Sequence, residues 1–251
     1  MTRRAATASA GVAADGRCAD PDLSHVACWI FDLDNTLYPA ECRLFAEIDA
    51  RMRAFIERRL GLAPDAARRV QKEFYVRYGT TMAGLMAEHA VEPEDFLAYV
   101  HDIDLSPLAD SPALAAALRR LPGKRYIFTN GSRKHAENVT ARLGVDGLFD
   151  DVFDIRAAGW TPKPRRETYE KFLAAHGVDP TRAAMFEDLA HNLVAPFELG
   201  MTTVLVTSRA AWIADEPAEK RPAAPGDLHD HVHHATDDLA AFLAAARVLD
   251  A

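Results

Sequence analysis

Apolar and polar positions follow two different patterns along this chain. Short apolar runs rich in β-branched and aromatic residues predict buried strands, and they alternate with amphipathic segments of helical spacing. The predicted strands are Val26–Phe31, Arg125–Phe128, Asp151–Ile155, Ala183–Phe186 and Thr202–Val206. The predicted helices are 112–121, 132–143, 164–176, a segment that ends at Leu199, and 236–248. Strands that alternate with helices predict an α/β fold with a doubly wound parallel sheet and right-handed crossovers.

The segment from residue 40 to residue 106 has only helical periodicity. Apolar residues recur there every three or four positions, and Gly61, Gly79 and Pro93 separate successive helices. We therefore expect an all-helical module at 40–106, inserted into a catalytic core formed by 23–39 and 107–251. Residues 1–22 lack an apolar stretch of the kind found in signal peptides and predict a disordered tail.

Composition adds limits to this picture. Of the 251 residues, 49% are hydrophobic and 26% charged, an ordinary globular balance, and the formal net charge of −8 argues against a nucleic-acid polymer or an anionic membrane as partner. No run of 18 apolar residues predicts a membrane span. The three cysteines, Cys18, Cys28 and Cys42, form no C-x-x-C pair and no disulfide framework, which favours a reducing, cytoplasmic location.

The first predicted strand ends in two acids, Asp32 and Asp34, which would point to the same side if the extended backbone continues. At 4 Å and an effective dielectric of 20, two such charges repel by roughly 4 kcal/mol, so they need either water or a cation. Solvated turn residues are one interpretation. A calcium-binding loop is excluded, because its sixth and twelfth positions would be Leu37 and Arg43 instead of Gly and Glu.

Three later loops on the same predicted edge of the sheet also carry polar residues. They are Thr129-Asn130, Lys163-Pro164 and Glu187-Asp188. Taken singly, each has an ordinary structural explanation, as a strand end, a surface lysine or acids at a helix start. Ligands of parallel sheets bind beyond the carboxyl ends of the strands, so we expect these loops to lie together.

Together the four loops supply the parts for phosphoryl transfer. Asp32, Asp34 and Asp188 could hold a hard divalent cation, most plausibly Mg²⁺, and Lys163 adds a fixed positive charge. Thr129 with nearby backbone N–H groups could bind the phosphate oxygens. Asp32 would then attack phosphorus to give an aspartyl-phosphate. Asp34 would protonate the leaving oxygen and later deprotonate the attacking water.

This set, in this order, resembles the haloacid dehalogenase superfamily of phosphatases over about residues 26–207. The resemblance implies that Asp32 is the nucleophile, Asp34 the general acid and base, and that Thr129 and Lys163 bind phosphate. It also implies Mg²⁺ bound by Asp32, by the backbone carbonyl of Asp34 and by a late acid, for which we favour Asp188, with Glu187 acting through water. Superfamily members that cleave carbon–halogen bonds lack an acid at the position of Asp34. The helical module resembles the superfamily's first type of cap, a lid over the substrate.

A closer resemblance is to the bacterial and yeast pyrimidine 5'-nucleotidase group. It is carried by Tyr78-Gly79-x-x-x-x-Gly84-Leu85, Phe128-Thr129-Asn130 with His135-Ala136, Lys163-Pro164, Asp188 with Asn192, and Leu199-Gly200-Met201. It implies a pyrimidine nucleoside monophosphate substrate, phosphate binding by Asn130, and substrate contacts from Gly79 and Thr80, which otherwise mark a helix break. The chain departs from the group at Glu187, where many members have Asp, and at Gly131, where a bulkier residue often follows the Asn. We expect a monomer or a homodimer.

Other interpretations remain open at this point. A related phosphatase for a sugar phosphate or another small phosphomonoester differs only in substrate, and a phosphate-binding scaffold would lack turnover. A phospho-receiver module has a similar acid cluster but carries its acid pair on the first strand and its phosphorylated Asp on a middle one. The histidines at 229, 231, 233 and 234 predict a solvated loop outside the active centre. No P-loop, dinucleotide fingerprint, nucleophile elbow or zincin motif is present.

Overall fold

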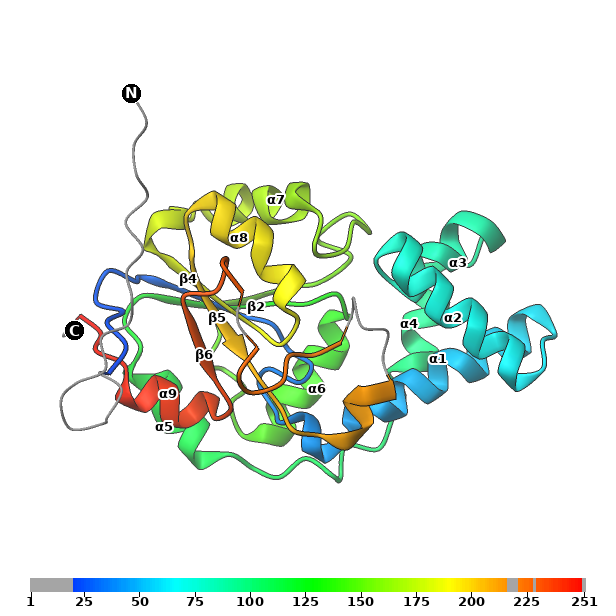
Figure 1. Ribbon diagram of the computed structural model, residues 1–251, viewed down its shortest axis with the longest axis horizontal. Coiled ribbons are helices and arrows are strands. Elements are labelled where there is room, and N and C mark those ends of the chain that lie inside the picture. Colours follow the sequence, from blue (N-terminus) through cyan, green and yellow to red (C-terminus); the bar gives the residue numbers. More distant parts are fainter. Residues whose placement is uncertain (1–19, 216–220, 228, 250–251) are drawn as a thin grey trace.

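The protein is built on one parallel sheet. The computed structural model describes residues 20–215, 221–227 and 229–249 (Figure 1). Its six strands are β1 (Cys28–Phe31), β2 (Lys124–Phe128), β3 (Asp151–Phe153), β4 (Ala183–Glu187), β5 (Thr202–Val206) and β6 (His234–Thr236). They lie in the order β3-β2-β1-β4-β5-β6, and every neighbouring pair is parallel. The predicted α/β fold with a doubly wound sheet is therefore confirmed.

Helices cover both faces of the sheet. On one face lie α5 (Pro112–Arg120), α6 (Arg133–Leu143) and α9 (Leu239–Ala245), and on the other α7 (Arg166–His176) and α8 (Val194–Leu199) (Figure 1). Successive residues of β1 face opposite layers, because side chains alternate along a strand. Trp29 and Phe31 pack with the first group of helices, and Cys28 and Ile30 with the second. All four are buried, as expected for a central strand.

Four helices form a separate layer at one end of the core (Figure 1). They are α1 (Leu44–Leu60), α2 (Pro64–Tyr78), α3 (Thr81–His89) and α4 (Pro93–Val100). Their apolar faces enclose a cluster of their own, which includes Ile48, Phe55, Phe74, Leu85 and Phe96. We call these four helices the cap helices. The division of the chain at residues 40 and 106 remains a prediction.

Short 3₁₀ segments occupy several connections: Ala40–Cys42, Pro180–Arg182, Ala190–Leu193 and Ala211–Asp215. The segment at Ala190–Leu193 leads into α8, where Pro196 is the third residue. An N–H at that position would have no partner within the helix, so proline is tolerated there.

The C-terminal part of the core differs from the prediction. Residues 234–236 form the edge strand β6, where the sequence predicted no strand, and α9 begins only at Leu239. The side chain of Asp238 caps this helix by accepting a hydrogen bond from the backbone N–H of Ala241 at 2.9 Å. The Pro-rich loop at 216–226 lies partly outside the described residues.

The predicted N-terminal tail overlaps only slightly with the described residues. Most of the predicted tail, residues 1–22, lies outside the described residues, as does Cys18. Asp22 is described, however, and forms a parallel bridge with Arg247 near the other end of the chain. The predicted boundary of the tail at residue 22 stays a prediction. None of the helices in the described ranges combines the length and the apolar character needed to cross a bilayer.

The histidine-rich segment is packed against the core. His231 Nε2 lies 2.7 Å from the carbonyl oxygen of Ala190, and His233 Nδ1 lies 2.8 Å from Thr203 Oγ1. His234 begins β6. Within the described residues, none of these histidines belongs to a group that could hold a metal ion.

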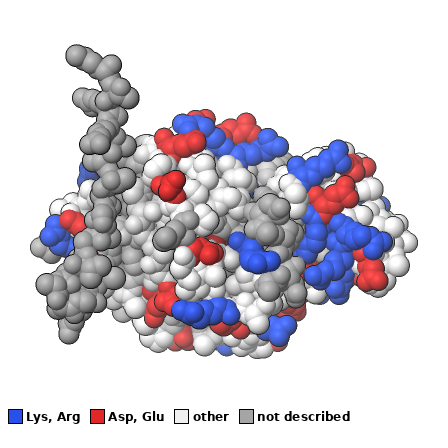
Figure 2. Space-filling model, viewed as in Figure 1, with Lys and Arg blue, Asp and Glu red and all other residues white. Residues whose placement is uncertain are grey.

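Charged side chains are distributed unevenly over the surface. In the view of Figure 2, Lys and Arg are prominent over the end occupied by the cap helices, whereas acidic and basic groups mix over the rest of that face. On this face the positive side chains are therefore concentrated at the cap end, although the formal net charge is −8.

Candidate active site

The polar motifs converge because their strands are neighbours. In the sheet, Phe31 of β1 is aligned with Ile127 of β2 on one side and with Phe186 of β4 on the other. The residues that follow these positions therefore leave the sheet at the same edge. The backbone N–H of Asp32 continues the pairing by donating to the carbonyl of Phe186 at 2.9 Å.

Lys163 lies at the centre of the site. Its Nζ is 2.6 Å from Asp32 Oδ1, 2.7 Å from Glu187 Oε2 and 3.0 Å from the backbone carbonyl oxygen of Phe128. The side chain is only 1% exposed. Burial lowers the pKa of its ammonium group, but the charges of Asp32 and Glu187 outweigh burial and raise it above the usual value. Lys163 is therefore a permanent positive charge inside the protein.

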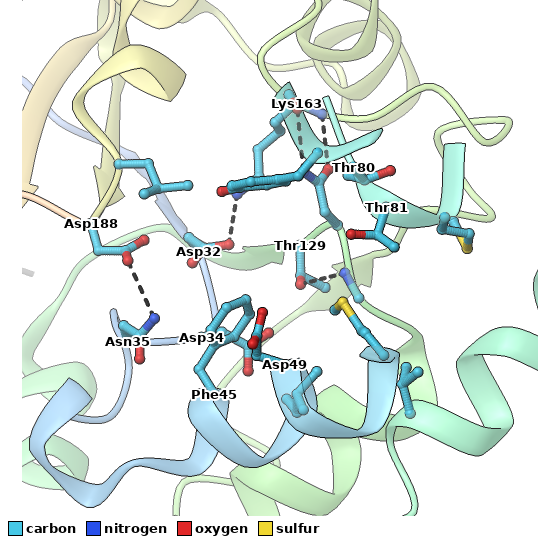
Figure 3. Close-up of a pocket in the computed structure, with 18 of the residues that line it drawn as sticks. Asp32, Asp34, Asn35, Phe45, Asp49, Thr80, Thr81, Thr129, Lys163 and Asp188 are labelled. Carbon is cyan, nitrogen blue, oxygen red and sulfur yellow. Dashed lines mark hydrogen bonds and ion pairs between the residues drawn. The ribbon is translucent and has the colours of Figure 1, made fainter. Parts of the chain in front are cut away.

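Three acids lie close together beside this lysine, and Figure 3 shows two of them, Asp32 and Asp188. Asp32, Glu187 and Asp188 each offer a carboxylate oxygen within 4.8 Å of the others, and all three are buried. Both oxygens of Glu187 are engaged, Oε2 by Lys163 and Oε1 by the side-chain amide of Asn192 at 3.0 Å. Asp188 Oδ2 accepts a longer hydrogen bond from Asn35 Nδ2, at 3.4 Å.

The electrostatics of this cluster favour a bound cation. Three ionised carboxylates and one ammonium group leave a formal charge of −2 among buried groups. Burial and the negative charge of Glu187 raise the pKa of Asp32 to about 7, although Lys163 opposes the shift. The same two causes raise the pKa of Asp188 well above its usual value. A hard divalent cation with oxygen ligands matches both the charge and the donor set.

Asp34 is held on a different side of the cavity. Its Oδ1 lies 2.5 Å from the hydroxyl oxygen of Tyr38 and 2.9 Å from His135 Nε2. Burial alone would raise the pKa of Asp34, but the charge and hydrogen bond of His135 and the hydrogen bond of Tyr38 lower it below its usual value. Burial and the charge of Asp34 raise the pKa of Tyr38, so its hydroxyl stays protonated. Tyr38 therefore donates to Asp34.

A second histidine lies behind the first. The ring of His101, at the end of α4, stacks on the ring of His135 with centroids 4.3 Å apart and planes inclined by 7°. Burial and the neighbouring His135 lower the pKa of His101 to about 3, which keeps its ring neutral. The sequence analysis assigned no role to Tyr38 or His101, and it used His135 only as part of a motif.

Thr129 and Asn130 are both brought to the site by the end of β2. Thr129 Oγ1 accepts a hydrogen bond from the backbone N–H of Gly131 at 2.9 Å. The amide side chain of Asn130 brackets the backbone of Lys163, accepting from its N–H at 2.8 Å and lying 3.3 Å from its carbonyl oxygen. This side chain fixes the loop that carries Lys163, so phosphate binding by Asn130, which stays a prediction, would use its backbone N–H.

A cavity opens between these motifs and the cap helices. Its lining includes all the core motif residues and, from the cap, Phe45, Asp49, Met52, Gln71, Lys72 and Tyr75. Thr80 also lines it, while its hydroxyl caps α3 by accepting from the N–H of Ala83 at 3.1 Å. Gly79 is not among the lining residues and faces the side chain of Pro162. The helix-break interpretation of residues 79 and 80 thus describes their local structure.

The sequence analysis missed a polar group on the cap wall. Gln71 Nε2 donates to the backbone and side-chain oxygens of Asp49 at 3.0 and 2.7 Å, and Lys72 Nζ lies 2.7 Å from the same carboxylate. These residues were hidden in the sequence because they stand on two different helices among ordinary surface charges.

The fold and the convergence of these loops define a class of hydrolase. Residues 26–196 match the haloacid dehalogenase-like hydrolase family, and the chain belongs to this family. Phosphate metabolism protein 8 of Saccharomyces cerevisiae is 30% identical in an alignment of 204 residues that covers 74% of this chain and 63% of the yeast protein. The chain thus covers less than two thirds of that relative.

Solved structures agree with the fold. CbbY from Rhodobacter sphaeroides in complex with phosphate has a TM-score of 0.58 at 17% identity, over 87% of this chain and 99% of its own. The L-2-haloacid dehalogenase from Xanthobacter autotrophicus has a TM-score of 0.54 at 18% identity, over 87% and 97%. At these identities the likeness concerns the fold alone.

Proposed function

We propose that the protein is a Mg²⁺-dependent phosphomonoester hydrolase that works through an aspartyl-phosphate on Asp32. The observation that carries this proposal is the contact of Lys163 with Asp32 and Glu187 at 2.6 and 2.7 Å, inside a buried acidic cluster. Four motifs that are distant along the chain meet there. The name of the yeast relative, which places that protein in phosphate metabolism, agrees with the proposal.

Asp34 favours phosphate esters over carbon–halogen bonds. Displacement of a halide needs no proton, because a halide is a good leaving group as an anion. An alkoxide is a poor one and needs an acid beside it. Asp34 lines the same cavity as Asp32 and supplies that acid.

In the first step a carboxylate oxygen of Asp32 bonds to phosphorus. The P–O bond to the leaving group breaks, its electron pair stays on the leaving oxygen, and Asp34 gives that oxygen a proton. Lys163 and the backbone N–H groups after Thr129 offset the charge of the phosphoryl oxygens. In the second step water bonds to phosphorus, Asp34 takes back a proton, and the Asp32–phosphorus ester opens.

Mg²⁺ would be held by Asp32, by the backbone carbonyl of Asp34 and by Asp188, with Glu187 acting through water. This division is supported by the contacts of Glu187, whose two carboxylate oxygens are held by Lys163 and Asn192, whereas the contact of Asp188 with Asn35 is long, at 3.4 Å. When bound, the cation supplies positive charge that lets a phosphate dianion approach the acids. Burial and the charge of Glu187 raise the pKa values of Asp32 and Asp188, and a bound cation would offset both effects.

A pyrimidine nucleoside 5'-monophosphate is the substrate that we propose. Beyond the acidic cluster the cavity is walled by Phe45, Met52, Tyr75 and Trp212, which offer apolar surface to a planar ring. Asp49 and Gln71 add hydrogen-bonding groups for a ribose or a base. Thr80 lines this end of the cavity, and Gly79 would act only through the path of the backbone.

The direct test is phosphate release from UMP, CMP, sugar phosphates and an aryl phosphate, with Mg²⁺ and after its removal by EDTA. We expect turnover that needs the metal and is fastest with the pyrimidine nucleotides. Asp32→Asn should lower kcat by roughly 10⁴-fold or more, because no other group can form the ester. Asp34→Ala should lower it by about 10²–10⁴-fold, the usual contribution of a general acid and base.

Three outcomes would contradict parts of this proposal. A wild-type rate in Asp32→Asn would refute the nucleophile, and a wild-type rate in Asp34→Ala would refute the acid–base role. A sugar phosphate preferred over every nucleotide would refute the substrate alone. Asp104→Asn is a suitable control, since this exposed Asp lies outside the cavity lining and accepts hydrogen bonds from nearby Ser106.

A further inference from the structure

Only one oxygen of the Asp34 carboxyl group is used in its contacts with Tyr38 and His135. Both groups meet Oδ1, at 2.5 and 2.9 Å. Tyr38 donates its hydroxyl hydrogen, and an ionised carboxylate can only accept, so His135 Nε2 carries a hydrogen as well. Two donors occupy the two lone-pair directions of Oδ1. The oxygen left to meet a ligand in the cavity is Oδ2.

His101 connects this arrangement to the cap. It follows the last residue of α4 and lies flat against His135, with 4.3 Å between the ring centroids. Its Nδ1 is 2.9 Å from Ser132 Oγ. Ser132 is also the residue that caps α6, where its Oγ accepts from the backbone N–H of His135 at 3.2 Å. His101 therefore contacts both the ring of His135 and the residue that starts its helix.

Gly131 leaves the space for His101. A Cβ atom at position 131 would lie 3.6 Å from both Cε1 and Nε2 of the His101 ring. The same Cβ atom would lie 3.2 Å from Thr129 Oγ1, so a longer side chain directed toward the His101 ring would have no free space there. The glycine, at which this chain departs from the pyrimidine nucleotidase group, is thus matched to a histidine that comes from the cap side.

We propose that Tyr38 and His135 are positioning residues for Asp34, and that His101 transmits the position of the cap helices to them. Because both donors sit on Oδ1, the proton that Asp34 takes from the attacking water in the second step is carried by Oδ2. In the forward step the Oδ2–H bond breaks and the proton passes to the leaving oxygen as the P–O bond opens. This inference rests on the proposed phosphatase function and adds the residues that hold its acid in place.

The test compares two leaving groups in the same variant. The leaving group of 4-nitrophenyl phosphate departs as a stable anion, whereas the ribose oxygen of UMP departs only with a proton. Since kcat/KM covers the steps up to release of the leaving group, its ratio for the two substrates reports on proton delivery. The ratio is also independent of the fraction of enzyme that is correctly folded, so partial misfolding of a variant does not affect it.

We expect His135→Leu and Tyr38→Phe to lower kcat/KM for UMP about tenfold or more beyond any loss with 4-nitrophenyl phosphate, within the 10²–10⁴-fold that a general acid contributes. His135→Gln keeps an N–H donor of similar reach and should recover part of the ratio. His101→Ala should shift the ratio in the same direction as His135→Leu. His101→Phe, which keeps a flat ring, should shift it less.

The opposing outcomes are distinct. Equal losses with both substrates in His135→Leu and Tyr38→Phe, or no loss with either, would overturn the positioning role. An unchanged ratio in His101→Ala beside a lowered ratio in His135→Leu would overturn the link to the cap. A wild-type protein that hydrolyses neither substrate would overturn the proposed function, and this inference with it.

Discussion

Buried charge separates the residues of this site from those elsewhere on the molecule. Lys163 and the carboxylates of Asp32 and Glu187 have side chains that are 1%, 9% and 1% exposed, respectively. Most other ion pairs involve exposed groups, such as Lys124 with Asp150. Exposed pairs contribute little to stability, whereas a buried charge that loses its partner is costly.

This difference gives a prediction for Lys163→Met. The change leaves two buried carboxylates without their cation, and it should lower the free energy of unfolding by about 3–5 kcal/mol at neutral pH. Urea unfolding followed by circular dichroism measures the change. Lys124→Met, which breaks an exposed pair, should leave the midpoint almost unchanged. Equal midpoints for the two variants would show that Lys163 is not held as the structure indicates.

At this scale the sequence predicted the residues that carry charge and missed those that orient them. Asp32, Lys163, Glu187 and Asp188 follow strands that the pattern placed correctly, so parallel-sheet geometry was enough to bring them together. The contacts of Asp34 with Tyr38 and His135 depend on rotamers and helix packing that no local pattern encodes. The side chain of Asn130 illustrates the same limit, because it bonds to the backbone of Lys163.

In helix α3, the helix propensity of a residue and the packing of its side chain favour different amino acids at the same position. Gly84 lies inside α3, where Ala would have the higher helix propensity, by roughly 1 kcal/mol. A Cβ atom at this position would lie 2.4 Å from Cγ of Phe74 in α2, which is far too close. The close approach of α2 and α3 therefore depends on the absence of a side chain.

Gly84→Ala should consequently destabilise the protein, by about 1–3 kcal/mol, despite its better helix propensity. Thermal unfolding followed by circular dichroism at 222 nm measures the loss. The same substitution in a Phe74→Ala background should cost less, since the loss of Cγ and Cδ2 removes two of the three closest contacts and leaves only Cβ, at 2.5 Å. An equal loss of stability in both backgrounds would show that the contact with Phe74 does not cause the destabilisation.

The elements that the sequence predicted well are those with strong apolar periodicity. The breaks between the cap helices at Gly61, Gly79 and Pro93 were predicted, and the strands β2, β4 and β5 were placed to within about two residues. Strand β6, at His234–Thr236, was missed because it is short, polar and at the edge of the sheet, where only one neighbour pairs with it. The last helix was predicted to start at residue 236, whereas α9 starts at Leu239, because the strand that precedes it was not recognised.

For the molecule as a whole, the important contact is the one between the cap helices and the core. Phe45 of α1 stacks with Trp212 of the core, with centroids 6.2 Å apart and planes inclined by 27°. Trp212 also donates its ring N–H to the carbonyl of Ala40 at 2.8 Å. Both aromatic residues line the cavity, so this contact forms part of its wall as well as of the interface.

Trp212→Ala should therefore weaken nucleotide binding more than the chemical step. Loss of an aromatic contact of about 0.5–1.5 kcal/mol corresponds to a KM for UMP that rises about 2- to 10-fold, with kcat much less affected. Steady-state kinetics separate the two constants. Trp212→Phe keeps a ring and should stay closer to the wild type. A fall in kcat at constant KM would instead assign Trp212 to the catalytic step.

The cap helices are inserted in the connection that leaves β1 after Asp34 and returns through α5 to β2. The pairing of β1 with β2 and β4 is complete without them. A lineage could accordingly exchange, lengthen or remodel this insertion while every strand kept its alignment. Substrate preference and reaction chemistry would then be inherited on separate parts of the chain, and could diverge at different rates.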